Sequence, residues 1–463
     1  MAGLSEQRMA IVRTLVETAP DRIVGSLQQA LSETPEGSAL GGVRQLVETE
    51  MFDRGLRNVV LQPIVPMCVP DGDPRTVTFP PRVLSLLWRA LRVHHPDLVR
   101  PLGGIDDDIA PAMLIDRQDI LAAVAARGLR EVSLPEFITV AKVCDGARPN
   151  GAALMADYLQ IAAIVRRATQ RLPDWISHPG GETTAAARLA YRDAVELADD
   201  AGPRFFQMLA AQMAQPWMVL RIISAVMDKP TERYLRDSEL SSFGEAVFDD
   251  VDEALAAIAC LDPEEGVDAA RKLAKLAKLV VQQVLEIETG MDLQRDQGWG
   301  LRAVKQRASL ASIVESRLRE AEKVSLEALP MQNGRQPRDR RPMPHLGAPP
   351  EPRVVGRAMA LLSFCEEIRT TANYGGFASA RTKMVEKLSG YIDHYVEDVL
   401  DMLRSGEADD PQVATAYLHL AADLKQLLVG GKAGELIRRR AFAAIVPERA
   451  AAAEALIAPL ARG

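Results

Sequence analysis

Apolar side chains recur at helical spacing in one segment after another between residues 110 and 329. Residues 264–289 show this most clearly, because Leu273, Leu276, Val280, Val284 and Ile287 fall on one face of a helix. Glycine and proline separate the segments, as expected where helices end and begin. The pattern predicts helices over residues 116–128, 134–146, 150–171, 182–200, 203–227, 231–260, 264–289 and 296–329.

The composition favours an all-α fold. Aromatic residues make up 5% of the 463 residues and apolar residues 48%, so a core would consist mainly of Ala, Leu, Val, Ile and Met. Such side chains suit close helix packing better than an aromatic-rich β-sandwich. A chain of this length can bury a full core without disulfides or metals. Since no fixed repeat of 30–50 residues is visible, we predict a multi-helix bundle or array rather than a regular solenoid.

The N-terminal part predicts short helices with one irregular insertion. Helical spacing covers most of the first 51 residues and returns after Pro80-Pro81. Residues 58–80 instead combine β-branched residues, prolines and a Pro70-Asp71-Gly72-Asp73 turn signal. We expect either a short hairpin or an extended loop packed on helices, because prolines confine strands to sheet edges.

A segment rich in proline and arginine predicts the main domain boundary. Residues 330–357 contain seven prolines and carry a net charge of +4. Proline blocks helices and no apolar period remains, so we expect a flexible linker. The predicted organisation is a large helical body over 1–329 with a sub-boundary near 110, the linker over 330–357, and a C-terminal helical domain over 358–463. Helices are expected over about 354–374, 378–404, 411–429 and 433–460.

The basic linker is also the predicted partner-binding segment. Its candidate contact residues are Arg335, Arg338, Arg340 and Arg341. Arginines on an otherwise acidic protein favour docking to an acidic partner or to an anionic membrane surface. A solubilising spacer is the alternative interpretation. The whole chain has a net charge of −8, which argues against nucleic-acid binding through general phosphate neutralisation.

Cysteine spacing and the apolar segments favour the cytoplasm. The four cysteines lie far apart and form neither a disulfide framework nor a short-range zinc pattern. The start of the chain lacks a signal-peptide pattern. The most apolar stretch, Phe205–Met227, contains three glutamines and an arginine, so we predict a core helix broken at Gln215-Pro216 rather than a membrane span. High Ala, Leu and Arg usage suggests a bacterial source with a GC-rich genome.

One helix carries weak candidates for a metal site. His394, Glu397 and Asp398 are spaced to converge on one face, and His419 on the next helix is the fourth candidate. Di-iron bundles use a Glu-x-x-His order on two helices, whereas here the order is reversed and occurs once. A solvated helix face is therefore the favoured interpretation, and we predict neither a metal nor another cofactor.

Other short patterns also have ordinary structural explanations. His94-His95 suits a helix C-terminus, although Cys68 could approach it if the insertion folds back. The Gly430-Gly431-Lys432 segment lacks the serine or threonine of a phosphate-binding loop. The acidic clusters at 106–108 and 249–253 are expected near helix starts, where carboxylates are favourable.

No catalytic constellation emerges, so we predict a cytoplasmic protein–protein interaction module, an adaptor or scaffold, that could also self-associate. Two alternatives remain open. One is a helical-bundle enzyme with a carboxylate–histidine metal site near His394. The other is a peripheral membrane tether that uses the basic linker.

Overall fold

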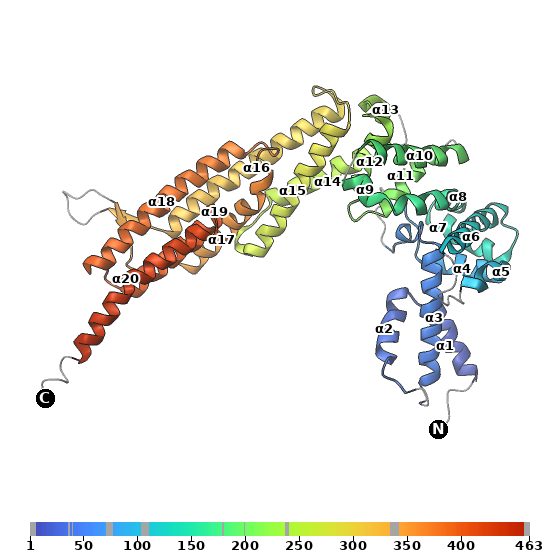
Figure 1. The fold of residues 1–463 in the computed structure, drawn as a ribbon, viewed down its shortest axis with the longest axis horizontal. Helices are drawn as coiled ribbons and strands as arrows, with labels where there is room; N and C mark the ends of the chain where they lie inside the picture. Colours follow the sequence, from blue (N-terminus) through green and yellow to red (C-terminus); the bar gives the residue numbers. More distant parts are fainter. Residues whose placement is uncertain are drawn as a thin grey trace. The chain divides into compact units, whose positions relative to one another are not determined.

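The computed structural model describes residues 6–35, 38, 40–70, 77–102, 111–177, 180–198, 200–236, 240–333 and 342–457. Twenty α-helices and two short strands make up this part of the chain, so the predicted all-α fold is confirmed. The chain divides into two compact units, Met1–Phe243 and Gly244–Gly463. Figure 1 shows the elements of both units in chain order.

Unit 1 contains thirteen α-helices within the described residues. Their bounds are α1 (Glu6–Thr18), α2 (Asp21–Leu31), α3 (Gly41–Val60), α4 (Arg82–His94), α5 (Pro96–Val99), α6 (Pro111–Glu131), α7 (Pro135–Ala147), α8 (Gly151–Thr169), α9 (Leu172–Ser177), α10 (Gly181–Leu197), α11 (Ala201–Ala211), α12 (Val219–Met227) and α13 (Glu232–Arg236). Helix α8 lies at the centre, because α6, α7, α10 and α11 all pack against it. This explains why Tyr158 is fully buried on α8, where its ring meets Phe79 edge to face at 6.2 Å.

The irregular insertion before α4 is a compact turn. After α3 the chain forms the 3₁₀ helix η1 (Val65–Met67), and Cys68 then pairs with Phe79 in an isolated bridge. The Phe79 amide donates to the Met67 carbonyl at 2.9 Å. The prolines account for the absence of regular strands in the described part of this segment, since each removes a backbone donor. Residues 71–76, which hold most of the predicted turn, lie outside the described residues.

The apolar stretch 205–227 is interrupted as predicted. Helix α11 ends at Ala211, and the chain passes through η3 (Pro216–Met218) into α12. The predicted single helix over 231–260 is wrong, because α13 ends at Arg236 and α14 begins at Ser241. Apolar periodicity alone did not reveal this end. No helix among the described residues is long and apolar enough to cross a membrane.

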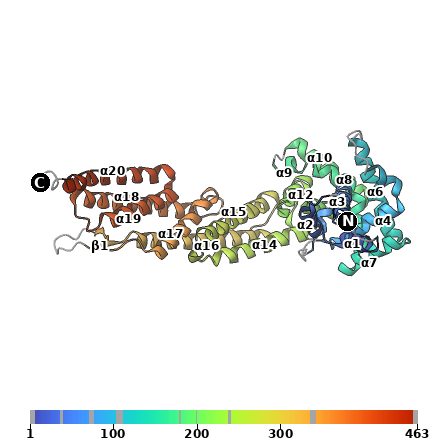
Figure 2. The ribbon, with the colours of Figure 1, turned by 90° about the horizontal axis from the view of Figure 1, so that it is seen from below.

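The remaining helices form unit 2, apart from the first three residues of α14, which precede the division. Their bounds are α14 (Ser241–Ala259), α15 (Val267–Gly290), α16 (Gly298–Ala328), α17 (Pro352–Glu367), α18 (Ala378–Ser405), α19 (Pro411–Val429) and α20 (Gly431–Ile457). Helices α15 and α16 pack together, as their matching apolar faces predict, and α17 packs against both. Helices α18, α19 and α20 run side by side in both views (Figures 1 and 2).

The predicted linker contains regular structure. Strands β1 (Met331–Asn333) and β2 (Pro342–Pro344) pair antiparallel, and α17 begins at Pro352, inside the segment. Proline is compatible with both settings, because it is tolerated at strand edges and favoured in the first turn of a helix. Helices α16 and α17 on either side pack against each other within unit 2. The two compact units divide between Phe243 and Gly244.

Candidate functional site: an interaction module in helices α1 to α3

Helices α1, α2 and α3 form an N-terminal module with a very small core. Helices α1 and α2 both pack against the longer α3 (Figure 1). The buried apolar cluster between them consists of Val16, Val24 and Val47, one from each helix. The other apolar side chains packed on this cluster are only partly buried. Three valines bury too little apolar surface to fix three helices alone, so polar contacts must help to hold them.

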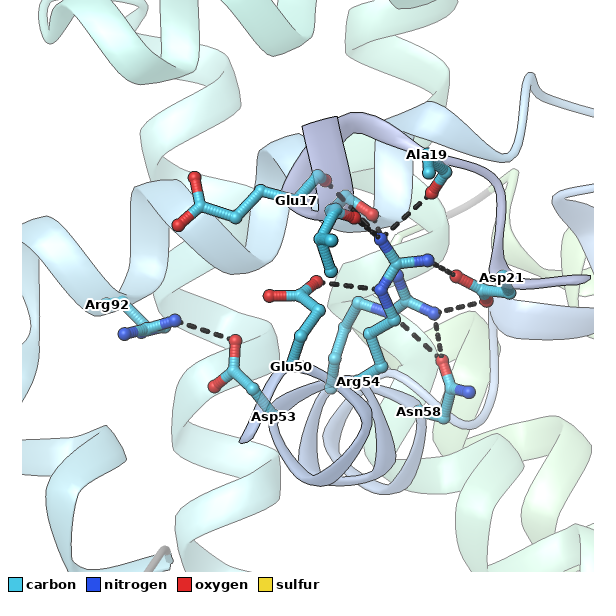
Figure 3. A network of polar contacts seen from close by, with 11 residues as sticks. Glu17, Ala19, Asp21, Glu50, Asp53, Arg54, Asn58 and Arg92 are labelled. Atoms are coloured by element: carbon cyan, nitrogen blue, oxygen red, sulfur yellow. Dashed lines mark hydrogen bonds and ion pairs between the residues drawn. The ribbon is translucent and has the colours of Figure 1, made fainter. Parts of the chain in front are cut away.

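A buried arginine on α3 closes the end of α1. Arg54 is 4% exposed, and its guanidinium donates to the carbonyl oxygens of Val16 at 2.8 Å and Ala19 at 2.9 Å (Figure 3). These carbonyls lie at the C-terminal end of α1, where helix carbonyls lack partners and a cation is favoured. The same guanidinium pairs with Glu50 at 2.7 Å and Asp21 at 2.5 Å.

A second buried arginine, one turn further along α3, joins the module to α4. Arg57 is 2% exposed and donates to Ser85 Oγ on α4 at 2.7 Å. It also donates to Asn58 Oδ1 and pairs with Asp21 at 2.6 Å. Asp21 is the first residue of α2, so one carboxylate holds both guanidiniums and the start of a helix.

The network balances its charges. Two buried guanidiniums face the carboxylates of Asp21 and Glu50, and Figure 3 shows the contacts of Arg54 with both carboxylates and with the end of α1. Partial burial opposes ionisation of Asp21, but the hydrogen bond from Arg57 and the charges of both arginines outweigh it. The pKa of Asp21 therefore lies below its ordinary value of 3.8. Because its donors are satisfied and its charge is neutralised, the network has a structural role: it holds α1, α2 and α3 together.

The module that this arginine network holds together exposes several large apolar side chains. Ile11 and Leu15 on α1 are 61% and 62% exposed, and Ile23 and Leu27 on α2 are 51% and 38% exposed. Each pair is spaced four residues apart and therefore shares one helix face. Phe52 on α3 is also exposed. Two helices of the same module thus each carry a pair of exposed apolar side chains on one face. A single exposed apolar residue forms no such stripe.

The sequence-predicted metal candidates lie on two helices of unit 2: His394, Glu397 and Asp398 on α18, and His419 on α19. Glu397 pairs with Arg440 of α20 at 2.6 Å, and His394 Nδ1 lies 2.7 Å from the Gly390 carbonyl oxygen of its own helix. Glu397, His394 and His419 are exposed. In the described part of the chain no group of three His, Cys, Asp or Glu residues is placed to hold a metal ion.

His94, the last residue of α4, contacts a carboxylate rather than a cysteine. His94 Nε2 lies 2.6 Å from Glu136 at the start of α7, and its ring stacks on Phe137 with centroids 6.1 Å apart. The hydrogen bond from His94 lowers the pKa of Glu136. This contact joins the C-terminal end of α4 to the N-terminal end of α7, where a carboxylate is favoured.

The predicted partner-binding arginines Arg335, Arg338, Arg340 and Arg341 lie outside the described residues, as does the acidic cluster at 106–108. The second acidic cluster is not at a helix start, contrary to our expectation. Asp249 and Asp252 lie within α14 and pair with Arg302 of α16 at 2.7 and 2.6 Å. Arg302 also lies over the Phe248 ring, 5.1 Å from its centroid. The cluster therefore joins two helices of unit 2.

The four cysteines differ sharply in their surroundings. Cys68, Cys144 and Cys365 are buried, and burial raises the pKa of each thiol to about 12, whereas Cys260 is exposed. Because the thiolate is the reactive form, we expect a maleimide to label the native protein once, at Cys260, and the unfolded protein four times. Intact-mass measurement before and after denaturation checks this. Rapid labelling of a second thiol in the native protein would contradict the buried positions.

Comparisons with known proteins add no assignment. No protein-family model matches the chain, and searches of curated proteins and of solved structures find no match either. The candidate module therefore depends on its own geometry. Sequence reasoning missed Arg54 and Arg57, although their three-residue spacing places both on one face of a helix that also carries apolar residues.

Proposed function

We propose that the chain is a protein–protein interaction module, an adaptor or scaffold, and that helices α1 and α2 form its partner-binding surface. The observation that carries the proposal is the exposure of Ile11, Leu15, Ile23 and Leu27 on helices held by a buried arginine network. Exposed apolar stripes of this kind mark sites where another protein packs.

The energetics of apolar burial support this surface. Fully burying one large aliphatic side chain contributes about 1.5–3 kcal/mol. Four such side chains on two helices are thus enough to act as anchors in an interface, where a few residues supply most of the binding energy. The arginine network keeps the anchors in place before a partner arrives, which reduces the ordering cost of binding.

The proposal extends to the compartment and to the kind of partner. We propose the cytoplasm, because all four cysteines are unpaired and such thiols persist in a reducing compartment. The partner is a second protein or a second copy of this chain. Nucleic acid is a poor candidate because the whole chain is acidic, with a net charge of −8.

The test replaces anchors with helix-compatible polar residues. In Ile11→Gln/Leu15→Gln, glutamine keeps the helix propensity and removes the apolar surface. A photo-crosslinking residue is placed at position 8 on α1 of the otherwise wild-type chain, which is expressed in its own cells. We expect it to cross-link to one polypeptide, either another protein or a second copy of this chain. The double substitution should reduce that capture by about tenfold, which corresponds to about 1.4 kcal/mol.

The matched control is Leu189→Gln/Leu197→Gln, which removes two exposed leucines from α10 in the same unit. Capture should remain at the wild-type level in this control, and both variants should melt at the wild-type temperature because the changed residues are exposed. Equal capture by the two double variants would refute the proposal, as would the absence of any specific cross-link from α1.

A further inference from the structure

Unit 2 contains a small cavity with aliphatic walls between α15 and α16. Its volume is about 180 Å³. The aliphatic residues that line it are Val280, Val281, Val284, Leu285 and Leu310. Four of these come from α15 and one from α16, so two packed helices define most of the space. An engineered, wholly apolar cavity of about 150 Å³ binds benzene, so a volume of this size accepts a single six-membered ring.

The loop after α17 supplies the remaining wall. Residues 373–375 line the cavity, and the loop is held by hydrogen bonds from Gly375 N to Thr371 O at 2.8 Å and from Phe377 N to Ala372 O at 3.1 Å. A Cβ at position 375 would lie 2.2 Å from the Phe377 ring, and Gly376 has a φ of +80°. Both glycines are therefore required for this tight loop, which makes the wall a defined surface.

An arginine with spare donors lines the cavity beside a glutamate. Arg307 Nη1 donates to Glu288 Oε2 at 2.9 Å, and both residues line the space. A guanidinium has five N–H donors, and within the described residues Glu288 is its one acceptor here. The Arg307 side chain is 42% exposed, so its other donors are accessible. A carboxylate suits a planar guanidinium, because two parallel hydrogen bonds can form.

We propose that this cavity binds a small monocarboxylate with a compact apolar body, of the size of benzoate. The ring occupies the aliphatic space between α15 and α16, and the carboxylate accepts hydrogen bonds from the Arg307 donors that Glu288 does not use. The aliphatic residues of α15 and α16 favour an apolar body on that side of the cavity, whereas the polar lining lies at Glu288, Arg307, Asn373 and Tyr374. This site is separate from the α1–α2 surface and does not depend on the proposed function.

The experiment titrates the full-length protein with 4-fluorobenzoate and follows the probe by fluorine NMR. We expect saturable binding that unlabelled benzoate displaces. In Arg307→Gln the affinity should fall by about tenfold or more, because a charge-assisted hydrogen bond contributes that much. In Leu285→Trp the indole should fill the space and weaken binding to a similar degree, while the Arg307–Glu288 pair remains.

Arg319→Gln is the matched control, because Arg319 is an exposed arginine on the same helix and does not line the cavity. It should bind the probe like the wild type. The neutral analogue 4-fluorobenzamide should bind more weakly than 4-fluorobenzoate to the wild-type chain. The inference is overturned if wild-type protein shows no saturable binding up to the solubility limit of the probe. It is equally overturned if Arg307→Gln or Leu285→Trp binds as the wild type does.

Discussion

Replacing Asp21 with asparagine should lower the free energy of unfolding of the α1–α3 module by about 2 kcal/mol, less than for a fully buried pair because the Asp21 side chain is 54% exposed. The substitution keeps the shape of the side chain but removes the charge that both Arg54 and Arg57 share. Arg54 retains Glu50, whereas Arg57 keeps only neutral acceptors at a position 2% exposed. Hydrogen exchange should accelerate in α1 and α2 and remain slow in α8, which lies at the centre of unit 1.

Asp53→Asn is the control for this prediction. Asp53 is also a carboxylate of the module and pairs with Arg92 at 2.7 Å, but Arg92 is half exposed (Figure 3). Exposed pairs contribute about 1 kcal/mol or less, so exchange in α1 and α2 should change little. Equal protection of the two helices in both variants would show that the shared carboxylate is not what holds them.

The dependence of stability on pH under acidic conditions gives an independent test of the role of Asp21. The pKa of Asp21 is lowered in the folded protein. Its stabilisation is therefore fully present above the ordinary pKa of 3.8 and is lost as the pH falls through the lowered folded value. Asp21→Asn should remove that contribution, so the exchange rates of α1 and α2 should depend less on pH in this range than those of the wild type.

Gly151→Ala should destabilise the packing of α7 against α8 by about 3 kcal/mol, the upper end of ordinary overpacking. A Cβ at this position would lie 2.1 Å from the carbonyl oxygen of Cys144 on α7. The clash is with backbone, so no rotation of a side chain can relieve it. Moving the two helices apart would also lengthen the hydrogen bond from Ala152 N to Asp145 Oδ1, which is 2.9 Å. Denaturant unfolding together with hydrogen exchange in α7 and α8 measures the effect.

Gly146→Ala provides a control with the opposite sign. Gly146 lies within α7, and a Cβ there would meet nothing within 4 Å. Alanine is the better helix former, by up to about 1 kcal/mol, so this variant should equal or exceed the wild type in stability. If Gly151→Ala were as stable as Gly146→Ala, the close approach at Cys144 would be refuted.

Helix positions were largely predictable because most helices here bury one continuous apolar stripe. The pair α15 and α16 illustrates this, since their apolar faces repeat over many turns and glycines lie near their ends. The break at Gln215-Pro216 was also visible, because proline cannot continue a helix in that setting. The end of α13 at Arg236 was not visible, since the apolar spacing continues from there into α14.

The candidate module was hidden for a different reason. In the sequence, Arg54 and Arg57 look like solvated charges on an amphipathic helix. Their burial depends on Asp21, which is more than thirty positions away, and on the end of α1. Local periodicity carries no information about such distant pairs. The exposure of Ile11 and Leu15 was equally inaccessible, because helical spacing marks them as core residues of α1.

The arginine network also sets an order of assembly for the N-terminus during synthesis. Helices α1 and α2 contain 13 and 11 residues, too few to persist in water without tertiary contacts. Arg54 and Arg57, which hold these helices, lie near the end of α3 and therefore leave the ribosome after α1 and α2. Residues 6–31 therefore stay unstructured until residue 57 has emerged. During synthesis the apolar side chains of α1 and α2 are thus exposed before the contacts that hold these helices exist, and a cell must keep them from premature contacts.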